Sequence, residues 1–478
     1  MSGEQFPGPG VTAVNAAAVK FASGTFSENI TVGTYVQQQF SLNDRLYLTA
    51  AIRADDNSAF GEDFDLVTYP KFGAAWVMSE EPFWPFSFIN TFRVRGAYGQ
   101  SGKQPISFAA LRVFQPMTAP GDQAGVRPLS VGNPELGPER SEEYEIGFEA
   151  GLFDDRIGID FNYYNKRTSD LILNRNIPPS AGFPGSQPVN IGEVTNTGIE
   201  LMVTGVPIDT RDVRLELMFT AAQNSNLITD MGGVPPLNIV TQQAREGFPV
   251  LGFFGRRVIS ADVAADPTTG APIVTNVMCD GGTGRDGVEQ GGSPVDCATA
   301  PDLYHGRPTP EWEGAITTNL TLFNRLTLYG MIDYQVNVWV FDWNIGGNCA
   351  SRLICATNQL ADSAMAHPVR AANWTFFHFG AAQHPDRSFA RVRQISASYS
   401  LPQSWVKKMF GASSASVTLS ARNLWLLWTR DKFGTGDPDI ASSNGANQAD
   451  GSLAQQYYIN FVPTPLNRQF VFSLRIGF

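Results

Sequence analysis

The segment from Gln469 to Phe478 alternates strictly between two kinds of side chain, and this constrains the fold more than any other feature. One set is apolar: Phe470, Phe472, Leu474, Ile476 and Phe478. The other set is mostly small or polar: Gln469, Val471, Ser473, Arg475 and Gly477. Because successive side chains of a β-strand point to opposite faces, the segment predicts a strand with one aromatic face that needs an apolar environment.

The same alternation recurs along the chain. It is found in residues 46–53, 92–98, 143–149, 157–164, 213–220, 326–334 and 417–422. Its period is two residues, as in half-buried strands, and not the 3.6 residues of a helix. We count about 13 or 14 such strands, which predicts an all-β, antiparallel architecture.

The connections between these strands are of two lengths. Residues 153–156, 323–325 and 209–212 are short polar turns of the kind that join β-hairpins. Long segments rich in Gly, Pro, Asp and Asn run roughly over residues 102–139, 224–312 and 334–389. Short turns at one end and long loops at the other are typical of an outer-membrane β-barrel, with its long loops extracellular.

The composition agrees with a membrane location. Charged residues make up 17% of the chain, against about 25% in typical soluble domains. No run of about 18 apolar residues indicates a transmembrane helix. Periodicity alone cannot separate a membrane barrel from a soluble β protein with an apolar interior. The loop asymmetry, the aromatic strand ends and the terminal Phe478 favour the membrane.

The sequence contains no recognisable catalytic motif. The four histidines, His305, His367, His378 and His384, lack HExxH spacing, and no nucleophile elbow is present. Glu143, Glu145 and Glu149 alternate on one strand face, which fits solvated lumen charges better than a catalytic carboxylate pair. We therefore expect no enzyme activity and no cofactor. The net charge of −11 argues against nucleic-acid binding.

Two further groups of residues leave alternatives open. The acidic stretch from Asp55 to Asn57 and from Glu62 to Asp65 could hold calcium, but it lacks EF-hand order and fits a solvated loop. A second group is aromatic and lies in a long loop: Trp339, Trp343, Trp374, Phe376 and Phe377. These rings could stack on sugars or peptide side chains, pack against a partner lipoprotein, or sit at the membrane interface. The substrate-binding residues stay unassigned.

The four cysteines lie in Gly-, Asp- and Asn-rich segments at Cys279, Cys297, Cys349 and Cys355. Their spacing does not match a zinc pattern. Two local disulfides in an oxidising compartment are expected, with nearest neighbours paired as a guess that sequence cannot prove.

Several blocks together resemble the barrel portion of SusC/RagA-like TonB-dependent outer-membrane transporters. They include "NPEL" at 133–136, "YYNKRTSDLI" at 163–172, "NIGEVTNTGIE" at 190–200, "GRPTPEW" at 306–312, "FARVRQIS" at 389–396, and "ARNL" at 421–424 followed by Asp437 and Pro438. The blocks run in family order from about Arg53 to Phe478. They carry turn glycines, strand-start prolines and interfacial aromatics, and so identify a scaffold without chemistry.

The resemblance implies that residues 1–478 form the C-terminal part of a transmembrane barrel. The complete barrel of the family has about 22 strands. The resemblance also implies TonB-dependent import of oligosaccharides or peptides with a SusD-like lipoprotein, in the outer membrane of a Gram-negative bacterium. The signal peptide, plug domain and the region that contacts TonB–ExbB–ExbD are not found, so we expect a fragment that is not competent alone. A passive pore or adhesin-type barrel is the alternative.

Overall fold

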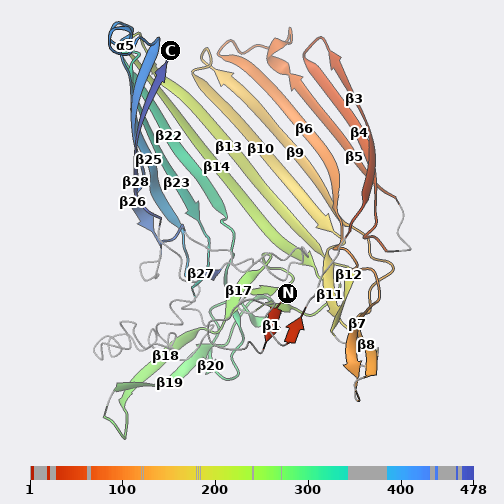
Figure 1. Cartoon of the computed structure of the whole chain (residues 1–478). Helices are drawn as coiled ribbons and strands as arrows, with labels where there is room; N and C mark the ends of the chain where they lie inside the picture. Colours follow the sequence, from red (N-terminus) through yellow and green to blue (C-terminus); the bar gives the residue numbers. More distant parts are fainter. Residues whose placement is uncertain are drawn as a thin grey trace.

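The structure is a computed structural model. It describes residues 2–4, 19–21, 28–61, 66–119, 121, 123–178, 180, 182–183, 185–239, 242–270, 272–342, 385–430, 437–439, 459–460 and 466–478. Thirteen antiparallel strands form one wide sheet, in the order β28-β26-β25-β23-β22-β14-β13-β10-β9-β6-β5-β4-β3. This confirms the predicted strand number and the all-β class. The sheet curves like an incomplete barrel wall, with β3 and β28 as its two edges (Figure 1).

The strands of the wide sheet are long. Their bounds are β3 Thr31–Leu42, β4 Leu46–Asn57, β5 Val67–Val77, β6 Ile89–Lys103, β9 Glu139–Leu152, β10 Ile157–Ser169, β13 Glu193–Asp209, β14 Val213–Asp230, β22 Trp312–Leu322, β23 Leu326–Val336, β25 Phe389–Ser400, β26 Ser414–Thr429 and β28 Gln469–Gly477. The shortest has 9 residues and the longest 18. About 9 to 11 residues suffice for a strand to cross a bilayer.

The two ends of the sheet differ as predicted. At one end, here called the turn end, hairpins close at residues 43–45, 153–156, 210–212 and 323–325. Asn43 and Asp44 both have positive φ, at 52° and 55°, as a tight turn between twisted strands requires. The turn end also carries η2 (Met78–Glu80) and the helix α5 (Gln403–Phe410). No described helix is long and apolar enough to cross a membrane.

The opposite end, here called the loop end, carries small sheets on the long connections (Figure 1). Their strands are β7 Val113–Ala119 with β8 Gln123–Ser130, β11 Ile172–Asn176 with β12 Ser186–Asn190, β15 Leu237–Ile239 with β16 Gln242–Ala244, β17 Gly252–Gly255 and β21 Leu303–Gly306, and β18 Val258–Ala265 with β19 Pro272–Asp280 and β20 Pro294–Asp296. We call these the loop-end sheets. The other described elements are β1 Ser2–Glu4 with β2 Val19–Phe21, β24 Phe341–Asp342 with β27 Ile459–Asn460, and η4 Arg285–Gly287.

Strand register places apolar side chains on one face across the sheet. Phe472 lies opposite Leu419, and the row continues through Ala397, Leu328, Leu320 and Leu215. A second row joins Phe161, Phe148, Val94, Trp76, Leu46 and Leu42. We call this side of the sheet the apolar face and the opposite side the polar face. Many apolar-face side chains are open, with Phe470 exposed to 75% and Phe472 to 65%.

Buried apolar side chains gather away from the middle of the sheet. One cluster joins Leu171, Leu173, Val194, Ile228, Met231 and Ala244 at the loop end, and two more lie within the loop-end sheets. A fourth cluster lies under α5 at the turn end. The hydrogen bonds between neighbouring strands therefore hold the wide sheet together, whereas buried hydrophobic clusters form at its two ends.

Candidate functional site

The polar face carries a ladder of ion pairs across three neighbouring strands. Arg93 and Arg95 of β6 both bind Oε1 of Glu149 on β9. Arg95 also donates to Asp160 on β10 at 2.6 Å. Strand register places Glu149 directly between Arg93 and Asp160. The ladder holds positive and negative side chains in fixed positions on the polar face. Within it, Glu149 is the ion-pair partner of two arginines.

The other predicted glutamates lie on the same face. Glu143 of β9 is opposite Lys166 of β10, with 3.9 Å between Oε2 and Nζ. Glu145 is exposed on the polar face, one register position from the apolar Ile146. Glu143 and Glu145 have no carboxylate as a register partner on β6 or β10. Glu149 has Asp160 as its register partner on β10, but the carboxylate of Glu149 also pairs with two arginines.

A groove of about 410 Å³ opens next to this ladder. Its charged and amide lining comes from Arg95, Asp160, Asn162, Glu200 and Glu313. Small residues on β14 and β22, including Ala222 and Gly314, leave room between the longer side chains. The groove therefore offers hydrogen-bond donors and acceptors of both signs to a polar molecule passing along the wall.

At the loop end, arginines before and within β25 are tied to aspartates from distant segments. Arg387 donates to Asp342 at 2.6 Å, with both side chains almost fully buried. Arg391 binds Asp437, and Arg393 binds Asp439 at 2.5 Å. We call these pairs, with the bond from Arg393 to Asp333 at 3.0 Å, the arginine clasp.

The arginine clasp joins two blocks that look unrelated in the sequence. The arginines belong to the "FARVRQIS" block and its approach, whereas Asp437 follows the "ARNL" block. Removing one partner of a buried ion pair leaves an uncompensated charge, which costs about 3 to 5 kcal/mol. The clasp thus fixes residues 437–439 against the loop end of β25.

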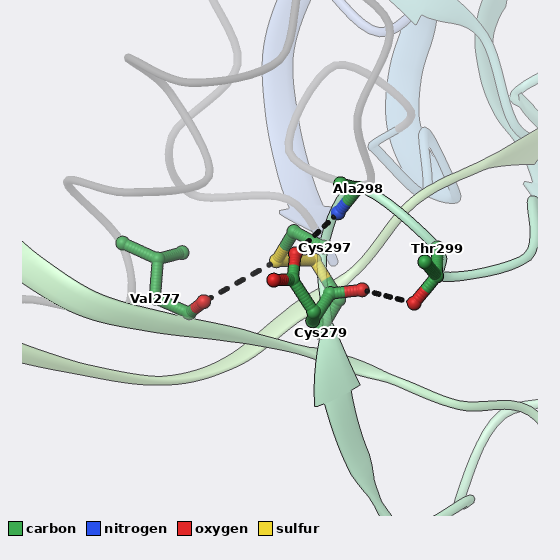
Figure 2. The surroundings of a disulfide bond; sticks show 6 residues. Val277, Cys279, Cys297, Ala298 and Thr299 are labelled. Carbon is green, nitrogen blue, oxygen red and sulfur yellow. Dashed lines mark hydrogen bonds between the residues drawn. A yellow bond between two sulfur atoms is a disulfide. The ribbon is translucent and has the colours of Figure 1, made fainter.

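A disulfide closes the sheet formed by β18, β19 and β20. Cys279 and Cys297 are bonded with their Cα atoms 4.8 Å apart, beside Val277, Ala298 and Thr299 (Figure 2). The predicted pairing of these two cysteines is confirmed. Cys349 and Cys355 lie outside the described residues. We call residues 258–300 the disulfide module.

Asp280 organises the turn of the disulfide module. Its side chain is 1% exposed, and its carboxylate accepts the backbone N–H groups of Gly282, Gly291 and Gly292 at 2.7 to 3.0 Å. Burial raises the pKa of Asp280, but these three hydrogen bonds and Arg257 outweigh burial and lower it. The buried carboxylate is therefore a structural anion at neutral pH.

His305 of β21 is also buried beside this module. Its Nε2 lies 2.9 Å from the Gly255 carbonyl oxygen, and its Nδ1 lies 3.3 Å from the Gln290 amide nitrogen. Burial lowers the pKa of His305 to about 4, and Arg257 acts in the same direction. A neutral ring that donates to Gly255 and accepts from Gln290 satisfies both nitrogens, so His305 is a core residue of the loop end.

Of the aromatic residues singled out in the sequence, Trp339 lies within the described residues. Trp339 is half-buried at the loop end, where its indole N–H donates to Asn337 at 3.1 Å and its ring lies against Gly306. Trp343, Trp374, Phe376, Phe377, His367, His378 and His384 lie outside the described residues. Trp339 therefore packs within the loop-end structure, where its ring already contacts Gly306.

The acidic loop is only partly described. Asp55 accepts from Arg53 at 2.8 Å, and the side-chain amide oxygen Oδ1 of Asn57 accepts the Ala59 N–H at 2.7 Å. Residues 62–65 lie outside the described part. Within the described residues, no three His, Cys, Asp or Glu side chains are grouped so that they could hold a metal ion.

Sequence reasoning missed the groove and the arginine clasp. The alternation of Arg391 and Arg393, and of Asp437 and Asp439, is a signal that was available, since both pairs have a spacing of two. This spacing does not show which arginine pairs with which aspartate. That depends on a chain reversal of 46 residues between Arg391 and Asp437.

Comparison with known proteins gives the family. The model of the family described as "TonB dependent receptor-like, beta-barrel" matches residues 4–424. TonB-dependent receptor P26 of Formosa agariphila is 28% identical over 468 residues, covering 92% of this chain and 45% of its own length. TonB-dependent receptor SusC of Bacteroides thetaiotaomicron is 28% identical over 217 residues, which cover 43% of this chain and 22% of SusC.

Solved structures agree in fold. The RagAB peptide importer in its open-open state superimposes with a TM-score of 0.75 at 18% identity, covering 98% of this chain and 49% of the solved chain. The chain thus spans about half the length of this structure and of the curated relative P26. The chain belongs to the TonB-dependent receptor-like β-barrel family, whose members are receptors and transporters of the Gram-negative outer membrane.

Proposed function

We propose that residues 1–478 form part of the barrel wall of an outer-membrane transporter that imports oligosaccharides or peptides. The polar face lines the transport lumen, and the apolar face contacts lipid. As the chain spans about half of its relatives, we propose that a plug and further strands complete the barrel. TonB–ExbB–ExbD then supplies the energy, and a SusD-like lipoprotein closes the extracellular loop end.

The observation that carries this proposal is the arrangement of the two faces. Rows of Phe, Leu and Ile are open on one face, whereas ion pairs and the charged groove lie on the other. In water this arrangement would expose an apolar surface over the whole sheet. In a bilayer, lipid covers the apolar face and the polar face borders an aqueous lumen.

The cargo class rests on chemistry and on family likeness. A groove with three carboxylates, one arginine and one amide offers both hydrogen-bond acceptors and donors, which suits a polar molecule such as a glycan or peptide. The solved RagAB structures are named as peptide importers, and the curated SusC is named as a TonB-dependent receptor.

The proposal is tested in the native host by deleting the gene and measuring uptake of labelled oligosaccharides and peptides. We expect uptake of one cargo class to fall in the deletion strain and in a strain lacking TonB. Uptake that depends on this gene but not on TonB would instead indicate a passive pore. A chain recovered as a detergent-free monomer outside the membrane fraction would contradict both readings.

A matched pair of variants locates the cargo path. Glu200→Gln removes a charge from the groove, whereas Ile199→Val changes the neighbouring residue on the apolar side of β13, which does not line the groove. We expect Glu200→Gln to raise the half-saturating cargo concentration and Ile199→Val to leave it unchanged. Equal effects of both variants, at equal amounts of protein in the membrane, would contradict a cargo path along the groove.

A further inference from the structure

The helix α5 occupies an unusual place at the turn end, where four described hairpins close with three or four residues and the connection of β5 to β6 runs over residues 78–88 with only the short η2. It follows Pro402, at the end of β25, and ends at Gly411, whose φ of 63° is left-handed. It lies beside the C-terminal end of β28 (Figure 1). A helix in place of a tight turn needs a reason beyond chain reversal.

One side of α5 is seated on the apolar face. Val406 is fully buried, in a cluster with Ala412 and Ala415 against which Leu401 and Ile476 pack. Ala415 and Ile476 are register partners, and they continue the rows formed by Val417 with Leu474 and Leu419 with Phe472. The helix therefore lies against the membrane-facing side of the sheet at its turn-end rim.

The helix turns two further apolar side chains outward. Trp405 is 60% exposed and Met409 is 66% exposed. At 100° per residue they lie about 40° apart on the helix and next to Val406. Lys407 and Lys408 occupy the other side, and both are exposed. The helix is amphipathic, and only part of its apolar side is used by Val406.

The helix α5 and the three strands that carry it and pack against it contain no acidic side chain. Residues 389–430 and 466–478, which include β25, α5, β26 and β28, contain no Asp or Glu. Within the described part of the chain, Lys407 and Lys408 form no ion pair. This rim is a positively charged edge of the apolar face, in a protein with a net charge of −11.

We propose that α5 is an interfacial helix that binds anionic phospholipid in the leaflet at the turn end. Trp405 and Met409 enter the boundary between headgroups and acyl chains, where amphipathic aromatic rings are favoured. Lys407 and Lys408 reach the lipid phosphates. The occupant is the membrane and not a protein, because the seat of the helix is continuous with the lipid-facing surface. This inference rests on the membrane location proposed above.

The test uses the protein as it is assembled in the outer membrane, reconstituted in vesicles of phosphatidylcholine with or without phosphatidylglycerol, brominated near the glycerol end of the acyl chain. The signal of Trp405 is the fluorescence difference between the parent protein, which has nine tryptophans in residues 1–478, and Trp405→Phe. We expect quenching of this difference signal, stronger for brominated phosphatidylglycerol. The preference should fall about fivefold for each of Lys407→Gln and Lys408→Gln.

A second position separates this inference from the proposed function. Phe472→Trp places a reporter on the apolar face of β28, and we expect lipid bromine to quench it without preference for charge. Quenching at position 472 but not of Trp405 overturns the interfacial helix and leaves the membrane wall intact. Quenching at neither position overturns the membrane location. If lipid quenches Trp405 only at a low ratio of protein to lipid, another copy of the protein covers the helix at higher ratios, which overturns the lipid as its occupant.

Discussion

The wide sheet and the loop-end sheets bury their apolar residues in opposite ways. On the wide sheet, Phe470 and Phe472 point outward, and charged residues line the other face. In the loop-end sheets, Phe253 and Leu303 are completely buried. The proposed membrane location explains why one chain follows two rules: its long strands would border lipid, whereas its loop-end sheets would fold in water. Substitutions of the same kind should therefore have different effects in the two regions.

The largest expected difference comes from truncating a phenylalanine in each region. Phe253→Ala empties a fully buried site and should lower the free energy of unfolding of the loop-end sheets by about 3 to 5 kcal/mol. Phe472→Ala truncates a side chain that is 65% exposed and faces lipid in the proposed arrangement, so it should change stability much less. Hydrogen exchange of the membrane-bound chain would measure both, and equal losses would contradict the comparison.

Breaking the disulfide should separate the two regions. Cys279 and Cys297 are 18 residues apart, and removing a crosslink over such a loop costs about 3 kcal/mol. In the double variant Cys279→Ala/Cys297→Ala we expect faster proteolysis within residues 258–300. The fragments of the wide sheet should stay protected. Simultaneous loss of protection in β9 and β10 would show that the two regions fold as one unit.

A charge introduced on either face of β28 should have effects of different size. Phe472→Arg places a charge in lipid and should lower stability by about 2 kcal/mol or more near the bilayer midplane. Ser473→Arg places the same charge on the polar face, where water reaches it. Denaturant unfolding in vesicles measures both variants. Greater damage from Ser473→Arg would reverse the assignment of the faces.

Acid should weaken the loop end before the wall. The pKa of His305 is lowered from 6.5 to about 4, so the unfolded loop binds a proton at a higher pH than the folded loop does. The stability that the neutral His305 ring contributes to the folded loop end is complete above pH 6.5 and is lost as the pH falls toward 4. We expect a loss of about 1 kcal/mol at about pH 5.5.

His305→Gln is the control for this pH effect, because a glutamine amide can still donate to Gly255 and does not titrate. Hydrogen exchange in β21 should then be nearly independent of pH between neutral and mildly acidic conditions, after correction for the chemical exchange rate. Asp280, whose pKa is lowered, adds a loss only below its ordinary value of 3.8. A variant with unchanged acid sensitivity would rule out His305 as its source.

The wide sheet was largely predictable because its pattern is local. The turns at residues 153–156 and 323–325 follow from short polar segments between alternating strands, and the structure closes hairpins there. The strand β3 was not among the alternating segments, since Gln37, Gln38 and Gln39 interrupt the pattern. It is recognised only through its pairing with β4.

The loop end was much less predictable. Its cores join residues from separate connections, such as Leu173 with Ile228, and these residues have no common period. The helix α5 was missed because eight residues give too little helical pattern to stand out between two strands. Local alternation therefore reveals the wall, while contacts between distant segments decide the groove and the arginine clasp.

The most direct test of the account is the water accessibility of two neighbouring residues on β9. Glu145 lies on the polar face and Ile146 on the apolar face, and both side chains are exposed. Cysteines introduced singly at these positions are treated with a membrane-impermeant maleimide in isolated outer membranes, with the parent chain as background. We predict labelling of Glu145→Cys and none of Ile146→Cys until the membrane is dissolved. Labelling of Ile146→Cys alone would contradict a lipid-facing apolar face.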